Sequence, residues 1–297
     1  MPDSITTANV VQYQANVALL LQQTDSRLRG ACTPYQLYGE SAEILEQFGQ
    51  STAVTGLPRH SDTPLLDVPQ DRRWCIPTDV EWGTMEDKQD KLRLIIDPES
   101  AYVKVGSAAL MRAMDDLVVA AMFGTAKTGK TGSTNTSFPS SQQVANTVGG
   151  AAACGLNVAK LREARKILRK AEVDFENETV YVGLCGDVEN MLLNEAQVIN
   201  GDFNNSKPLA VGQISGFAGF TFIHTERFVG GAASAAPGTP YQIPAWVKSG
   251  MAFGVWNDLN ASVDQRPDKR GAWQVYLKMT CGATRLEEKR VVQILAV

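Results

Sequence analysis

The sequence predicts an α+β fold, because it combines a long helical segment, a strand–helix–strand alternation and a strand-rich C-terminal end. Its 297 residues suffice for one large domain or for two of ordinary size. Hydrophobic residues make up 44% of the chain and charged residues 20%, so the chain can bury a sizeable core. The 28 Lys and Arg against 32 Asp and Glu leave a net charge of −4, which argues against a protein held to nucleic acid by a basic surface.

Residues 1–57 are predicted to form an arm with little core of its own. The segment NVVQYQANVALLLQQ (9–23) is modestly apolar with helical spacing. The segment GESAEILEQFG (39–49) predicts a short second helix that ends at Gly49 and places three apolar side chains on one face, those of Ile44, Leu45 and Phe48. The first residues lack the basic start and apolar block of a secretory signal, so we expect a soluble intracellular protein.

Residues 59–99 are predicted to form a long two-stranded excursion. Strand-like segments at 73–76, 80–82 and 92–96 alternate with Pro and Asp turns. Six basic and ten acidic residues fall within these 41 positions, about twice the chain average, so the ribbon cannot bury both faces in a core of its own. An isolated hairpin is marginal in water, so we expect it to lie on another subunit. The cations expected to make contacts between subunits are Arg72, Arg73, Lys88, Lys91 and Arg93.

The clearest helix start follows this ribbon. Asp97 can cap the helix, Pro98 suits its first position and Glu99 favours its positive end. The helix is predicted over 98–124, where Gly124 ends it, as a rod of roughly 39 Å. Its packed stripe is predicted at three- and four-residue steps and includes two charges, which suggests a helix between a core and an interface: Tyr102, Val105, Ala109, Arg112, Asp116, Val119 and Phe123.

One segment matches a phosphate-binding motif. GTAKTGKT (124–131) fits the P-loop pattern GxxxxGK[ST]. A P-loop follows a short strand and opens a helix, whereas here a helical segment precedes the motif and GSTNTSFPSSQQ (132–143) follows it. Asp187 is the weak candidate for the second, acidic half of such a site. We interpret the glycines as the end of a helix followed by a flexible loop, and the motif as a coincidence.

An α/β layer is predicted after this loop. Asn157 should cap the helix VAKLREARKILRKAEV (158–173), with its apolar side buried and six cations outside on a solvated face: Lys160, Arg162, Arg165, Lys166, Arg169 and Lys170. A buried strand over 179–185, a helix over 187–199 and a strand over 219–228 complete the layer. A loop is predicted over 230–244, and four strands then follow, at 251–255, 261–265, 273–281 and 291–297.

No catalytic, cofactor-binding or metal-binding residue is predicted. The two histidines, His60 and His224, have no near partner in sequence and are interpreted as a surface and a packed side chain. The five cysteines lie far apart without a CxxC pair, so reduced thiols are expected: Cys32, Cys75, Cys154, Cys185 and Cys281.

The order of these segments, with particular phrases, resembles the major capsid proteins of tailed phages that share the Hong Kong 97 fold. The resemblance runs from about His60 to Val297 and is carried by four phrases: DTPLLDVPQDRRW, DKQDKLRLIIDPESAYVKVGSAALMRAMDDLVVAAMFGTA, QISGFAGFTFIHTERF and PDKRGAWQVYLKMTCGATRLEEKRVVQI. It implies an α+β Hong Kong 97-type capsid fold with an N-terminal arm, an extended β-hairpin loop, a peripheral domain with a long spine helix and an axial α/β domain. The implied boundaries are 1–57 for the arm, 58–97 for the extended loop, 98–149 and 258–297 for the peripheral domain with the spine helix at 98–124, and 150–257 for the axial domain.

The resemblance also implies a structural function with no reaction catalysed and no cofactor. The chain would self-assemble, as hexamers and pentamers, into the icosahedral shell that encloses the packaged double-stranded DNA of a tailed bacteriophage. A portal and scaffolding or decoration proteins would be further partners, the DNA would be contacted non-specifically, and no membrane would be bound. The protein would reside in the virion after assembly in the host bacterial cytoplasm. The mild acidity fits, because a strongly basic lining would hold DNA too tightly.

Three alternatives stay open on the sequence alone. An encapsulin-like compartment for a protein cargo would share the fold. A P-loop nucleotidase, through residues 124–131, or a metabolic enzyme of unknown chemistry would belong to a different class.

Overall fold

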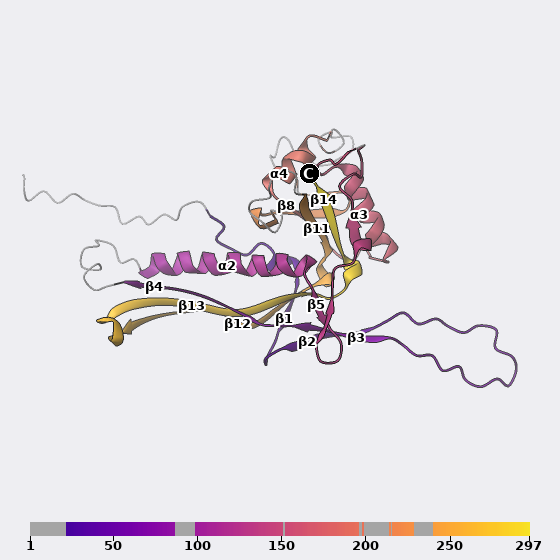
Figure 1. The fold of residues 1–297 in the computed structure, drawn as a ribbon, viewed down its shortest axis with the longest axis horizontal. Coiled ribbons are helices and arrows are strands. Elements are labelled where there is room, and N and C mark those ends of the chain that lie inside the picture. The colour runs from indigo at the N-terminus through magenta and orange to yellow at the C-terminus, as the bar shows by residue number, and fades with distance from the viewer. Residues whose placement is uncertain are drawn as a thin grey trace, which may run out of the picture.

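The structure is a computed structural model that describes residues 22–86, 99–150, 152–195, 198, 214, 216–228 and 240–297. The described chain forms an elongated unit, a six-stranded unit at one end of it, and a hairpin that projects beyond that end (Figure 1). This mixture of helices and mainly antiparallel sheets confirms the predicted α+β class.

The elongated unit consists of one long helix on a four-stranded sheet. Helix α2 (Glu99–Phe123) lies along strands ordered β1 (Thr33–Gln36), β12 (Met251–Arg266), β13 (Ala272–Arg285) and β4 (Thr78–Glu86) (Figure 1). The predicted helix is confirmed within a residue of its C-terminal end, whereas Asp97 and Pro98 lie outside the described residues. β12 is one strand of 16 residues, so the turn expected between 255 and 261 is instead an irregularity in its pairing with β13.

The packed face of α2 differs from the predicted stripe. Its fully buried apolar residues recur at four-residue steps from Leu110 through Met114 and Val118 to Met122, and they share a core with β12 and β13. Asp116, which the predicted stripe includes, is exposed. Both faces of α2 are largely covered, one by the sheet and one by residues 22–32, so apolar periodicity alone cannot select a single stripe.

A second sheet forms the base of the projecting hairpin, in the order β2 (Ala42–Phe48), β3 (Gln70–Cys75), β5 (Ala126–Thr128) and β6 (Thr134–Thr136). Two predictions are wrong here. The helix expected over 39–49 is strand β2, because β3 pairs with it along its length. The hairpin expected over 58–97 is formed instead by β2 and β3 with residues 49–69 between them, because β4 pairs with β13 rather than with β3.

The six-stranded unit has the order β7 (Gln143–Val144), β14 (Val291–Ala296), β11 (Tyr241–Val247), β8 (Val180–Leu184), β10 (Phe220–His224) and β9 (Gly216–Phe217). Helices α3 (Val158–Lys170) and α4 (Gly186–Leu193) share one apolar core with one face of this sheet. Asn157 caps α3 as predicted, accepting a hydrogen bond from the backbone N of Lys160 at 2.8 Å. The predicted strand over 179–185 is also confirmed.

Three assignments in this unit are corrected. β14 lies in this sheet, not with the long helix, because its almost wholly buried residues find partners on both sides, in β7 and β11. β11 begins at Tyr241, inside the expected loop. Lys160, expected on the solvated face, is fully buried, and its Nζ donates to the carbonyl oxygens of Cys154 and of Leu295, the latter at 2.9 Å.

Candidate functional site

The projecting hairpin exposes an unusual amount of apolar surface. Residues 49–69 extend away from both units (Figure 1), and the exposed fraction reaches 96% for Leu65, 64% for Phe48 and 49% for Leu66. Leu57 and Val54 are also about half exposed. Exposed apolar side chains that recur along one projecting segment are typical of a surface that contacts another macromolecule.

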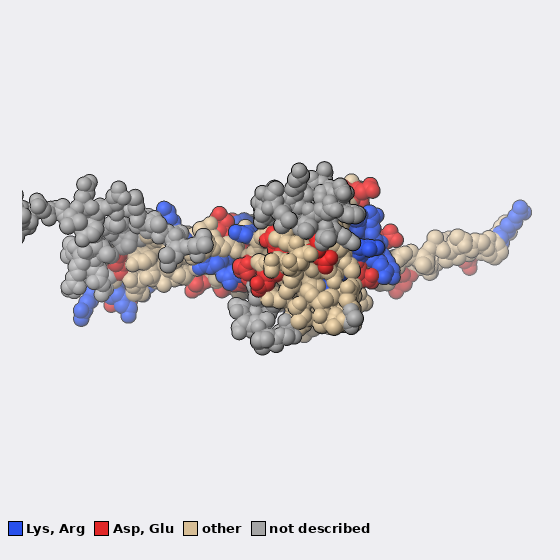
Figure 2. Space-filling view, turned by 90° about the horizontal axis from the view of Figure 1, so that it is seen from above, with Lys and Arg blue, Asp and Glu red and all other residues tan. Residues whose placement is uncertain are grey.

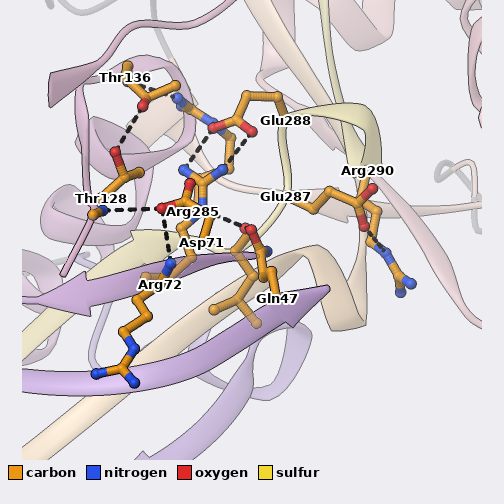
Figure 3. Close-up of polar contacts among 12 residues, drawn as sticks. Gln47, Asp71, Arg72, Thr128, Thr136, Arg285, Glu287, Glu288 and Arg290 are labelled. Carbon is orange, nitrogen blue, oxygen red and sulfur yellow. Dashed lines mark hydrogen bonds and ion pairs between the residues drawn. The ribbon is translucent and has the colours of Figure 1, made fainter. Parts of the chain in front are cut away.

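A buried ion-pair network, which we call the hinge network (Arg73, Arg285 and Glu288), fixes the base of this hairpin (Figure 3). Glu288 accepts two hydrogen bonds from the guanidinium group of Arg73, at 2.8 and 2.7 Å, and lies 3.6 Å from Nε of Arg285. The side chains of Arg73 and Arg285 are only 5% and 0% exposed, and among the described residues Glu288 is the carboxylate that pairs with both of these buried charges. Paired, bidentate geometry of this kind holds β3 in a fixed direction relative to the C-terminal segment.

Arg285 also ends the long helix. Its Nη1 donates to the carbonyl oxygens of Met122 and Gly124 at 2.9 and 3.0 Å, which satisfies the C-terminal carbonyls of α2. Its guanidinium group lies 5.2 Å from the ring centroid of Phe138. Burial lowers the pKa of Arg285, and the charge of Glu288 opposes that shift. The hinge network therefore connects the hairpin, the end of α2 and strand β13 through one set of charges.

A groove of about 560 Å³ lies beside the hinge network, between the hairpin base and the body. Leu45, Phe48 and Pro69 line its hairpin side, and Pro139 and Glu287 line its body side. The hairpin therefore joins the body through a polar hinge and an open, partly apolar groove.

Asp115 attaches the N-terminal segment to α2. This fully buried carboxylate accepts hydrogen bonds from the hydroxyl of Ser26 at 2.6 Å and from the backbone N of Arg27 and Leu28 at 3.1 and 3.3 Å. Arg112, one turn earlier, donates to the carbonyl oxygen of Gln23 at 3.0 Å. Arg112 was predicted as a charge within the packed stripe of the helix, and here it binds the N-terminal segment of its own chain.

The predicted contact residues divide into two groups. Arg72 pairs with Glu43 and Glu46 at 3.2 and 3.1 Å, and Arg73 pairs with Glu288, so the expectation that these arginines have no partner within their own chain is wrong. The carboxylates that pair with these two arginines belong to the same chain, and its fold places them beside strand β3. Their contact with a neighbouring subunit stays a prediction. The other predicted contact residues, Lys88, Lys91 and Arg93, lie outside the described residues.

The P-loop-like motif has the wrong structure for binding phosphate. Residues 126–136 form the small hairpin of β5 and β6, and Gly129 and Gly132 have positive φ angles of 84° and 69° in its turn. The glycines therefore serve a tight turn, where Trp74 Nε1 donates to the carbonyl oxygen of Gly129 at 2.7 Å. No helix begins at Lys130, whose side chain is exposed.

The remaining candidates for chemistry are accounted for structurally. His224 is half-buried, with Nδ1 3.2 Å from Glu189 and Nε2 3.0 Å from the carbonyl oxygen of Ile214, while His60 lies on the exposed hairpin loop. Within the described ranges no three His, Cys, Asp or Glu residues gather to hold a metal ion. The five cysteines are free. Among the helices that the structure describes, none combines the length and the apolarity needed to cross a bilayer.

Sequence reasoning missed Arg285, Glu288 and Asp115. Glu288 and Arg73 are 215 positions apart, and the segment RLEEKR (285–290) has the composition of a solvated turn. A weak signal was present at Asp115, as one of two adjacent carboxylates within the otherwise apolar segment AMDDLVVAAMF (113–123) of a long helix.

Comparison with known proteins places this architecture among capsids. The family model described as phage capsid protein matches residues 5–297. The capsid structure of the cyanophage P-SCSP1u is similar with a TM-score of 0.74 and 16% identity, covering 100% of this chain and 95% of that one. The capsid of the Helicobacter pylori bacteriophage KHP30 has a TM-score of 0.71 and 10% identity over 99% and 96% of the two chains. That of the cyanophage Pam1 has a TM-score of 0.69 and 14% identity over 100% and 99%. No curated protein matched the sequence.

Proposed function

This chain belongs to the phage capsid protein family and has the Hong Kong 97-type fold, and from that premise we propose how it builds a shell. Copies of the chain join as hexamers and pentamers into a closed icosahedral shell around the double-stranded DNA of a tailed phage. A contact between two different surface patches repeats around a ring when the rotation that relates neighbouring subunits closes after five or six copies. One chain can therefore form both pentamers and hexamers. The protein catalyses no reaction and assembles in the host cytoplasm before it resides in the virion.

The observation that carries this proposal is the projecting hairpin. The side chains of Leu65 and Leu66 are 96% and 49% exposed on this projecting segment. In an isolated subunit they lower its solubility and do not stabilise its fold. Placed across a neighbouring subunit, each buried leucine stabilises the contact by about 1.5 to 3 kcal/mol. Small gains multiply, because a shell repeats the contact at every interface.

The parts of the fold then take distinct positions in the shell. α2 with β4, β12 and β13 forms the peripheral domain, the six-stranded unit forms the axial domain, and the β2–β3 hairpin forms the extended loop. Residues 22–32, held by Asp115, continue the N-terminal arm. Portal, scaffolding or decoration proteins complete the particle. The encapsulin-like alternative lacks a supporting observation, and the nucleotidase alternative lacks a phosphate-binding loop at 124–131.

Sedimentation of purified protein tests the role of the hairpin. We expect Leu65→Asp/Leu66→Asp to leave circular dichroism unchanged and to abolish fast-sedimenting particles, because two charges would be buried at every contact. The matched control is Ser61→Asp/Thr63→Asp, which adds the same charge to exposed polar positions of the same loop. Equal particle yield from the leucine variant and the control would refute a neighbour contact at the hairpin.

A further inference from the structure

We propose that the basic face of α3 contacts an acidic flank around α4 on a second copy of this chain. The basic face consists of Arg162, Lys166, Arg169 and Lys170, and the acidic flank of Asp187, Glu195 and Glu226. The inference rests on the proposed function, because the head-to-tail contacts of a ring join two different flanks of neighbouring copies.

The basic face is a regular stripe on an otherwise well-packed helix. Arg162, Lys166 and Lys170 recur at four-residue steps and are exposed, while Leu161 and Leu168 on the other side are fully buried. Arg162 and Lys170 make no ion pair with any residue that the structure describes, so two of the four charges are available to a partner. Seen from above, Lys and Arg gather on the side of the six-stranded unit that faces the hairpin (Figure 2).

The flank around α4 carries acidic residues beside three arginines that bond within their own chain: Arg27 to the carbonyl oxygen of His224, Arg112 to that of Gln23, and Arg227 to Asp116. Residues 186–195 contain three acidic residues and no Lys or Arg. Among the residues that the structure describes, Asp187 accepts one hydrogen bond, from the hydroxyl of Tyr241 at 3.0 Å, and Glu226 accepts one, from the backbone N of Gly186 at 2.9 Å. Each carboxylate has about four lone-pair sites and can accept further hydrogen bonds from a partner. The hydrogen bond to Asp187, with the added charges of Asp187 and Glu226, raises the pKa of Tyr241.

The direction of the hairpin relates the two surfaces. The hairpin and α3 lie on the same side of the six-stranded unit, and α4 lies farther from the hairpin (Figure 1). A neighbour that receives the hairpin therefore also faces α3, and in a ring it presents its opposite side, the one with α4. The basic face of one copy would then meet the acidic flank of the next. Complementary charges of this kind determine the register of a contact, and they add less to its affinity.

A charge-exchange experiment on the full chain tests this contact. The reversed variant is Arg162→Glu/Lys166→Glu/Lys170→Glu, and the restored variant adds Asp187→Lys/Glu195→Lys. A control with the same change in net charge is Lys104→Glu/Lys130→Glu/Lys278→Glu, at three exposed lysines elsewhere. Particle yield is measured by sedimentation at low and high salt, with circular dichroism for folding.

We expect the reversed variant to lose at least tenfold in particle yield relative to the control, and the restored variant to recover at least half of that loss. If the reversed variant does not fold, Arg162→Gln/Lys166→Gln/Lys170→Gln should still lower the yield at least threefold. A reversed variant that assembles like the control, or a restored variant no better than the folded reversed one, overturns this contact while leaving the shell function intact. A wild-type chain that forms no particles overturns both.

Discussion

Replacing Glu288 with Gln tests whether the hinge network holds the hairpin. The substitution keeps the shape of the side chain but removes the carboxylate charge that pairs with both Arg73 and Arg285, whose side chains are 5% and 0% exposed. Breaking a buried ion pair by neutralising one partner costs about 3 to 5 kcal/mol, because the remaining charges stay buried. At about 2 to 3 °C for each kcal/mol, the midpoint of thermal unfolding should fall by roughly 6 to 15 °C.

The neighbouring carboxylate provides a matched control. Glu287 pairs with Arg290 at 2.8 Å, but its side chain is 40% exposed, so Glu287→Gln should cost only about 0.2 to 1 kcal/mol. Both variants would be measured as unassembled subunits, by urea titration followed with circular dichroism. If the free energy of unfolding of Glu288→Gln lies within about 0.5 kcal/mol of that of Glu287→Gln, the hinge network does not hold the base of the hairpin.

Three further predictions concern the rest of the chain. Lys130→Ala should change the free energy of unfolding by less than about 0.5 kcal/mol and the protein should hydrolyse no ATP, whereas an ATPase rate that this variant abolishes would restore the P-loop interpretation. Ala109→Pro should cost about 3 kcal/mol or more and yield no soluble particles, against about 1 kcal/mol for Ala109→Gly; normal particles from the proline variant would show that α2 is not continuous. Burial raises the pKa of Cys32 and of Cys75 to about 12, so the folded thiols keep protons that unfolded thiols lose above pH 9. Stability should therefore fall as pH rises from 9 towards 12, and Cys32→Ala/Cys75→Ala should reduce that slope in urea titrations.

Local signals in the sequence predicted the parts of the fold that depend on local interactions. The end of α2 at Gly124 and the cap of α3 at Asn157 each rest on residues within one helical turn, and both predictions hold. Strand β2 shows the opposite case. Its residues AEILEQF favour a helix, and only pairing with β3 makes them extended.

The hinge network could not be predicted, because its members meet only after the chain has folded. Arg73 was expected to face a neighbouring subunit, since a basic residue in a charged ribbon has no local sign of burial. Glu288 lies 215 positions away in a segment that resembles an exposed turn. The function was predictable nonetheless, because family phrases extend through the ribbon, the long helix and the C-terminal strands, and the family model matches residues 5–297.

Electron microscopy of the purified wild-type protein tests the shell-forming function most directly. We expect closed shells of uniform diameter, in which the hairpin of each subunit lies against its neighbour and the six-stranded units surround the axes of the rings. A preparation that contains only folded monomers or small open oligomers, at concentrations and salt conditions that favour association, would contradict it.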